Sequence, residues 1–183
     1  MCQKPAERWK MRILTATTDI YTMAIQIRSM RQEDNAALAK IIRDIFIEFD
    51  APLTGTVYSD PQTDHLYEVF TEEKCAYFVA EEDGVVLGGC GVYPTDGLPE
   101  GCAELVKFYL SPASRGKGLG RTLMERSFEA AKELGYRQLY LESFPQLATA
   151  VGMYKKAGFY DIPEQLGNSG HYATTVWMLK DLD

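Results

Sequence analysis

Long apolar runs are missing from the 183-residue sequence. No stretch approaches the roughly 18 to 20 apolar residues that a membrane-spanning helix needs. The charged first ten residues are not followed by the apolar segment of a secretory signal. We therefore expect neither a membrane span nor an export signal.

Cysteine and histidine are scarce as well. The four cysteines contain no Cys-x-x-Cys pair, and together with the two histidines they show no spacing typical of zinc sites. A chain of this length with 46% hydrophobic residues can build a core without disulfides. We therefore expect reduced thiols, a cytoplasmic location and no metal. The four cysteines are Cys2, Cys75, Cys90 and Cys102, and the two histidines are His65 and His171.

An excess of basic residues is also lacking. The chain has 19 Lys and Arg against 26 Asp and Glu, a formal net charge of -7. This balance argues against a nucleic-acid partner, because nucleic-acid-binding proteins usually carry a basic face. It suits a cationic substrate, although acidity also simply keeps many proteins soluble.

The sequence predicts one domain preceded by a short extension. Residues 1–22 show no sustained hydrophobic period, whereas a strand-like alternation starts at Met23. We interpret 1–22 as an appended or poorly ordered extension and 23–183 as the domain. An extra strand or helix docked on the body is the alternative for 1–22.

Hydrophobic spacing from Met23 onward predicts an α/β domain around a mixed, mostly antiparallel sheet. The expected order is one strand, two helices, three strands, a helix, a strand, a helix and two strands. Asp83-Gly84 between two apolar runs predicts a hairpin. Expected strands include 76–80, 85–93, 103–110, 138–142 and 172–179, and the expected helices are 33–49, 63–70, 119–134 and 147–157.

The most informative stretch is a glycine-rich loop, 111–121, between a predicted strand and a predicted helix. Its glycines allow a tight turn that leads into a helix N-terminus, where free N–H groups favour anions. The pattern lacks the third glycine of the Rossmann fingerprint and the final Lys-Ser/Thr of a P-loop. We interpret it as a pyrophosphate site, with a plain connecting turn as the alternative.

Arg115-x-x-Gly118-x-Gly120 resembles the acetyl-CoA signature of the GNAT superfamily, the GCN5-related N-acetyltransferases. The preceding segment, 103–112, resembles the family's fourth strand. Downstream, the segment 150–159 resembles the family's Ala…Tyr-x-Lys-x-Gly-Phe motif. The order of elements over 23–183 is also that of the family.

The resemblance implies a GNAT-like domain whose fourth and fifth strands splay apart to admit acetyl-CoA as co-substrate. Main-chain groups of Phe108, Tyr109 and Leu110 would then bind the pantetheine arm. The pyrophosphate would lie against Arg115, Gly116, Lys117, Gly118, Leu119 and Gly120, with Arg121 close by. A homodimer, common in the family, leaves no mark in this sequence.

Acetyl transfer to an amine requires a neutral amine, and a lysine-like amine titrates near ~10.4. A base is therefore useful, and Glu104 in the apolar strand 103–110 is the candidate. In the family's histone-acetyltransferase-like members, a glutamate at the matching strand position serves as general base. Burial or a relaying water would have to strengthen an ordinary carboxylate for the task. A paired or partly exposed structural carboxylate is the alternative.

Tyr154 is the candidate acid, since it matches the family's motif tyrosine near the cofactor sulfur. A phenol can protonate a departing thiolate, whose thiol should resemble cysteine at ~8.5. A core aromatic is the alternative. By analogy, a backbone N–H near Tyr109 or Leu110 meets the oxyanion. Direct transfer needs no nucleophile, so Cys90 and Cys102 are assigned to core packing.

Several other polar residues are weaker candidates for the acceptor pocket or the cofactor. A turn before the last strand explains the sequence around His171 as well as a role in the acceptor pocket does. A solvated loop explains the acidic segment 58–64 better than such a role does. These weaker candidates are His171, Tyr58, Asp60, Asp64 and Ser143.

The sequence thus predicts an acyl-CoA-dependent N-acyltransferase, most simply one that moves acetyl directly to a primary amine of a small molecule. A protein amine as acceptor, a longer acyl group, a non-catalytic acetyl-CoA sensor and a module for another phosphate ligand remain open.

Overall fold

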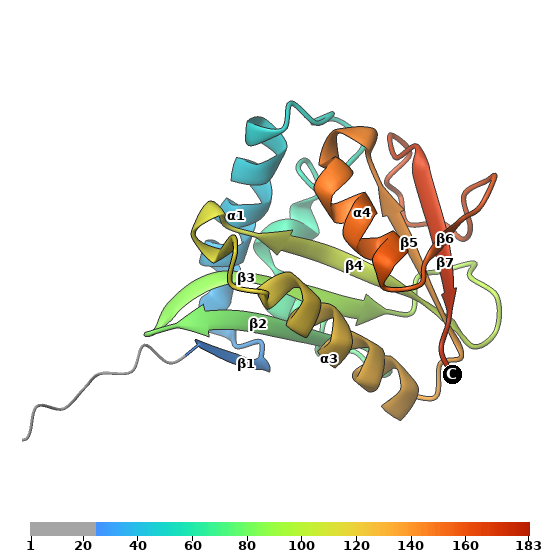
Figure 1. The fold of residues 1–183 in the computed structure, drawn as a ribbon, viewed down its shortest axis with the longest axis horizontal. Coiled ribbons are helices and arrows are strands. Elements are labelled where there is room, and N and C mark those ends of the chain that lie inside the picture. The colour runs from blue at the N-terminus through green and yellow to red at the C-terminus, as the bar shows by residue number, and fades with distance from the viewer. Residues whose placement is uncertain (1–24) are drawn as a thin grey trace, which may run out of the picture.

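The computed structural model describes residues 25–183, which form a seven-stranded sheet with helices on both faces (Figure 1). The sheet order is β1-β2-β3-β4-β5-β7-β6, and only the β4–β5 pair is parallel. The predicted single α/β domain with a mostly antiparallel mixed sheet is confirmed. The interpretation of 1–22 as an extension concerns residues outside the described range.

The helices and strands occur along the chain in the predicted order. The strands are β1 (Ile25–Ser29), β2 (Ala76–Glu82), β3 (Val85–Tyr93), β4 (Cys102–Leu110), β5 (Gln138–Ser143), β6 (Tyr160–Asp161) and β7 (Val176–Asp181). The α-helices are α1 (Asn35–Glu48), α2 (Leu66–Val69), α3 (Leu119–Glu133) and α4 (Ala148–Lys156).

Two elements differ from the sequence-based expectation. The expected helix 63–70 is split, because Pro61 begins a 3₁₀ turn that ends at Asp64, and α2 starts only after His65. The last strand begins at Val176 rather than at Tyr172. Tyr172 is 75% exposed and belongs to the turn before the strand, where its ring lies over Gly55.

Alternation along the strands builds two cores, one on each face of the sheet. In β2, Tyr77 and Val79 face α1 and α2, whereas Phe78 and Ala80 face the side of α3 and α4. The helices therefore cover both faces, and α1 and α3 each bury an apolar stripe against the strands. Within residues 25–183, no helix is both long and apolar enough to cross a membrane.

The sheet opens between β4 and β5. The two strands pair only over Cys102–Glu104 against Gln138–Tyr140, although β4 runs on to Leu110. A parallel ladder that stops this early leaves the remainder of β4 without a strand neighbour on that side. The expected splayed strands are thus present, and the gap lies next to α4 (Figure 1).

A β-bulge distorts β4 at the opening. Gly89 pairs with Tyr109 but Gly91 pairs with Val106, so two residues of β4 stand opposite one residue of β3. One of the two, Lys107, has φ of +52°, a value that non-glycine residues rarely adopt. Such backbone strain persists where the surrounding structure holds it, and it is frequent at functional sites.

Candidate active site

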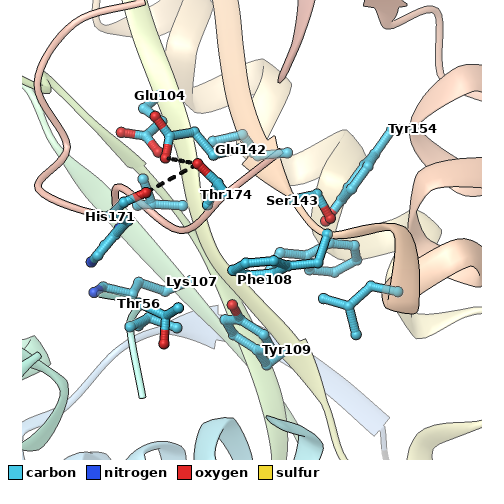
Figure 2. A pocket seen from close by; sticks show the side chains of 15 residues that line it. Thr56, Glu104, Lys107, Phe108, Tyr109, Glu142, Ser143, Tyr154, His171 and Thr174 are labelled. Carbon is cyan, nitrogen blue, oxygen red and sulfur yellow. Dashed lines mark hydrogen bonds between the residues drawn. The ribbon is translucent and has the colours of Figure 1, made fainter. Parts of the chain in front are cut away.

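Two cavities meet at the opening between β4 and β5. The larger has a volume of about 540 Å³ and lies along the end of β4, the glycine-rich loop and α4. The smaller, of about 50 Å³, lies deeper, among β4, β5 and the loops beside them (Figure 2). Phe108, Tyr109 and Leu147 line both cavities, so the two spaces adjoin.

The larger cavity contains most of the residues that the sequence assigns to the cofactor. An extended thioester could lie in it with its phosphates at the loop and its acyl end toward the smaller cavity. Lys117 is the exception, since its ammonium pairs with Glu82 and does not line the cavity. The expected residues on its wall are Phe108, Tyr109, Leu110, Arg115, Gly116, Gly118, Leu119, Gly120 and Arg121.

The loop geometry explains two of its glycines. Gly118 caps the N-terminus of α3 with φ of +74°, a left-handed conformation that glycine adopts without strain. At Gly120, an added Cβ would lie 2.6 Å from the terminal methyl of Met153, so any larger residue would displace that flexible side chain of α4. The loop therefore presents backbone N–H groups at a helix N-terminus, the arrangement that binds phosphate.

The two arginines of the loop are both paired with carboxylates. Arg115 pairs with Glu48 at 2.5 Å, and Arg121 pairs with Glu125 at 2.7 Å. These pairs are exposed, and exposed pairs contribute little stability. A pyrophosphate can therefore compete with the carboxylates for the guanidinium groups at small cost.

Glu104 lies in the wall of the smaller cavity and is 4% exposed. Thr95, after β3, donates a hydrogen bond of 2.5 Å to its carboxylate. Burial and the nearby charge of Glu142 raise the pKa of Glu104 to about 8, while Thr95 and Lys107 oppose the shift. Once ionised, a carboxylate of this proton affinity is a stronger base than an ordinary glutamate.

Tyr154 of α4 lines the same cavity and is 6% exposed. Its ring packs against Phe108 and Phe159, while its hydroxyl end points toward Ser143 at the end of β5 (Figure 2). Burial raises the pKa of the phenol well above its usual value, so it is protonated at neutral pH. Tyr154 is thus both a core aromatic and a wall of the cavity.

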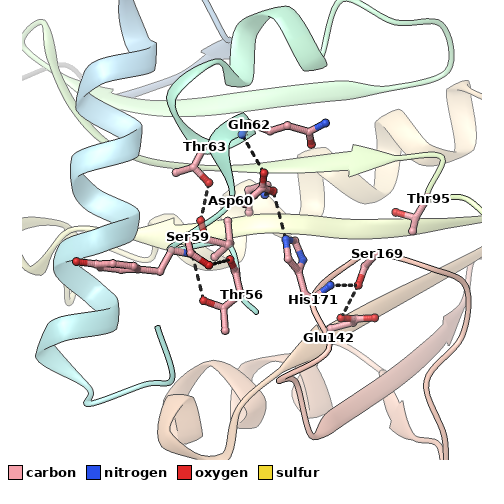
Figure 3. A network of polar contacts seen from close by, with 12 residues as sticks. Thr56, Ser59, Asp60, Gln62, Thr63, Thr95, Glu142, Ser169 and His171 are labelled. Carbon is pink, nitrogen blue, oxygen red and sulfur yellow. Dashed lines mark hydrogen bonds and ion pairs between the residues drawn. The ribbon is translucent and has the colours of Figure 1, made fainter. Parts of the chain in front are cut away.

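A polar cluster joins three distant segments beside the cavity. Lys107 Nζ lies 3.0 Å from Asp60, and His171 Nε2 lies 3.3 Å from the same carboxylate oxygen (Figure 3). Burial lowers the pKa of Lys107, and the negative charge and hydrogen bond of Asp60 partly offset this decrease. Burial raises the pKa of Asp60. The hydrogen bond from His171 and the charge of Lys107 together have a larger effect in the opposite direction, so the net pKa of Asp60 is lowered.

The weaker sequence candidates divide into two groups. His171 and Ser143 line the smaller cavity, and Asp60 supports it through Lys107. Tyr58 instead packs on Phe46, and Asp64 forms an exposed pair with Arg43. Neither Tyr58 nor Asp64 lines either cavity.

Sequence reasoning missed several polar residues of this region, among them Lys107, Glu142, Thr95 and Thr174. Lys107 and Glu142 are charged residues inside apolar strands, which is the same signal that singled out Glu104. Thr95 and Thr174 carry no comparable signal, because their loops come close to the site only after folding. Within residues 25–183, no group of three His, Cys, Asp or Glu side chains is arranged to hold a metal ion.

Comparison with known proteins agrees with this geometry. The model of the Acetyltransferase (GNAT) family matches residues 38–159. An uncharacterized N-acetyltransferase of Escherichia coli, YjgM, is 38% identical over 157 residues, which cover 85% of this chain and 94% of that protein.

Two solved structures share the fold. A GNAT-family acetyltransferase from Staphylococcus aureus superposes with a TM-score of 0.75 at 17% identity, covering 87% of this chain and all of the other. The putative acetyltransferase yncA from Salmonella typhimurium, solved with acetyl-CoA, gives a TM-score of 0.69 at 24% identity and covers 87% and 95%. The match to the family model and to the Escherichia coli relative shows that the chain belongs to the acetyltransferase (GNAT) family and is an acetyl-CoA-dependent acyltransferase.

Proposed function

We propose that this enzyme transfers acetyl directly from acetyl-CoA to a primary amine of a small molecule. The observation that carries the proposal is the junction of the two cavities, where Glu104 and Tyr154 line the smaller space at the end of the larger one. The smaller volume, about 50 Å³, has room for the reacting amino group of an acceptor. The three unpaired cysteines within residues 25–183 favour the cytoplasm as its compartment.

In the cofactor complex, the pyrophosphate binds the N–H groups of 115–120 and the pantetheine arm follows residues 108–110 of β4. This path uses the side of β4 that β5 leaves unpaired. It brings the thioester to Phe108 and Tyr109, the residues that both cavities share. Backbone N–H groups beside the bulge at Lys107 then face the carbonyl oxygen and stabilise the oxyanion.

Glu104 accepts the proton of the attacking amine. The nitrogen lone pair forms the new C–N bond at the thioester carbon, and the C–S bond breaks as the tetrahedral intermediate collapses. Because the pKa of Glu104 is about 8, the ionised, basic form becomes more abundant as the pH rises through 8. Activity should therefore rise with pH in this range.

Tyr154 supplies a proton to the departing thiolate. Its high pKa keeps the phenol protonated until the C–S bond breaks. The same dry cavity raises the proton affinity of the thiolate, which favours the transfer. No residue needs to form a covalent intermediate, so the buried Cys90 and Cys102 take no part.

The function is tested by acetyl-CoA consumption with a panel of amines, with products identified by mass spectrometry. We expect an N-acetylated small amine and one equivalent of free CoA for each product molecule. Acetylation only of protein or peptide amines would contradict the assignment of a small acceptor. Tight binding of acetyl-CoA without any acetylated product would contradict the proposed amine transfer.

Glu104→Gln should lower kcat/KM about 10²- to 10⁴-fold, because the amide cannot accept the proton. The rise of kcat/KM with pH near 8 should disappear with it. The exposed Glu100→Gln is the matched control and should retain the wild-type profile. A Glu104→Gln enzyme with an unchanged rate would remove Glu104 as the base.

Tyr154→Phe should lower kcat about 10- to 100-fold with little change in the Kd of acetyl-CoA, because packing is retained and only the proton donor is lost. Binding is measured by calorimetry and turnover by steady-state kinetics. Tyr160→Phe, at a half-exposed tyrosine of β6, is the control. Equal turnover in both variants would exclude Tyr154 as the acid.

Gly118→Glu should weaken acetyl-CoA binding at least about tenfold, because it places a carboxylate at the phosphate loop. Gly135→Glu is a closely matched control. Gly135 also has positive φ, and a Cβ added there would meet no atom within 4 Å, but it follows the far end of α3. Equal affinities in the two folded variants would contradict the pyrophosphate assignment.

A further inference from the structure

Glu142 of β5 is the centre of a hydrogen-bond network beside the acceptor cavity. Its carboxylate accepts hydrogen bonds from Tyr140 Oη at 2.9 Å and Gln165 Nε2 at 2.8 Å on one oxygen. Ser169 Oγ at 2.9 Å and Thr174 Oγ1 at 3.0 Å donate to the other. All four donors are neutral groups.

These bonds tie the segment 165–174 to β5. Leu166 N–H donates to Tyr140 Oη at 3.2 Å, and His171 N–H donates to Ser169 Oγ at 3.1 Å. The segment then reaches Asp60 through the His171 ring (Figure 3). Glu142 is therefore the anchor of the chain segment that holds His171 and Thr174 in the cavity wall.

The charge of Glu142 is not neutralised locally. Among residues 25–183, neither Glu142 nor Glu104 takes part in an ion pair, and both line the same small cavity. Lys107, in the same wall, is paired with Asp60. The groups that act on Glu104 from the packed elements are Glu142 of β5, Lys107 of β4 and Thr95 after β3, with the phenols of Tyr109 and Tyr140 nearby.

We propose that Glu142 is a positioning residue that acts through Glu104: its negative charge strengthens Glu104 as a base, and its four hydrogen bonds hold 165–174 beside the cavity. The role rests on the proposed function of Glu104. Two like charges repel each other strongly in a low-dielectric site. The negative charge of Glu142 therefore makes the ionised form of Glu104 less favourable, so Glu104 binds a proton more readily.

A purely structural role for Glu142 predicts a different outcome. If Glu142 only anchored the loop, its loss would reduce activity by the same factor at every pH. If its charge also acts on Glu104, its loss changes the pH at which Glu104 becomes basic. The pH profile therefore separates the two roles.

Glu142→Gln keeps the size of the side chain and removes the charge, and its amide nitrogen can no longer accept two of the four hydrogen bonds. We expect the midpoint of the rise in kcat/KM to move down by about one pH unit. We also expect the high-pH plateau to fall several-fold, because a weaker base accepts the proton less well. Ser169→Ala removes one donor but keeps the charge, and its midpoint should stay at the wild-type pH. A Glu142→Gln midpoint at the wild-type pH would overturn the proposal.

A second measurement does not depend on turnover. In enzyme labelled with ¹³C-glutamate, the Glu104 carboxyl signal is assigned by its loss in Glu104→Gln and followed as a function of pH. We expect its titration midpoint to fall in Glu142→Gln and to stay in Asp181→Asn, which changes a hydrogen-bonded carboxylate that lines neither cavity. A shifted midpoint in an enzyme that acetylates no amine would reject the proposed function alone, whereas an unshifted midpoint would reject the role of Glu142.

Discussion

Pairing between β4 and β5 ends at Glu104 and Tyr140, and both cavities lie beyond that point. Strand pairing must end there for a cofactor to reach the interior, and backbone groups of β4 are then left for a ligand to bind. The same point brings the end of the cofactor cavity against the small cavity that holds Glu104. The bulge at Lys107 bends β4 along this edge, so the strain lies where the reacting groups must meet.

The site is arranged by charge as much as by shape. Lys107 and Asp60 neutralise each other at one side, whereas Glu104 and Glu142 share the cavity without a cation paired to either among the described residues. A cationic amine would be attracted to this side of the cavity, and it must lose one proton to solvent before the neutral amine can attack. The acidic balance of the whole chain suits the same class of substrate.

Local sequence signals predicted the fold well and the site only in part. The hairpin at Asp83-Gly84, the apolar stripe of α3 and the glycines of its N-terminal loop each act within a few residues, so the sequence reveals them. The partners of Glu104 come from loops and strands far apart in the chain. Thr95 and Thr174 come close to the two carboxylates only when the sheet is assembled. The prediction that the last strand starts at Tyr172 is wrong, because the contact of Tyr172 with Gly55 is a tertiary one that the local sequence does not show.

A crystal structure of the enzyme with acetyl-CoA and no amine would show where the thioester lies relative to Glu104 and Tyr154. We predict the pyrophosphate on the N–H groups of 115–120, the pantetheine arm along 108–110, and the acetyl carbonyl carbon between Glu104 and Tyr154. A thioester that ends elsewhere, with the small cavity out of its reach, would contradict the claim that these two residues serve the transfer.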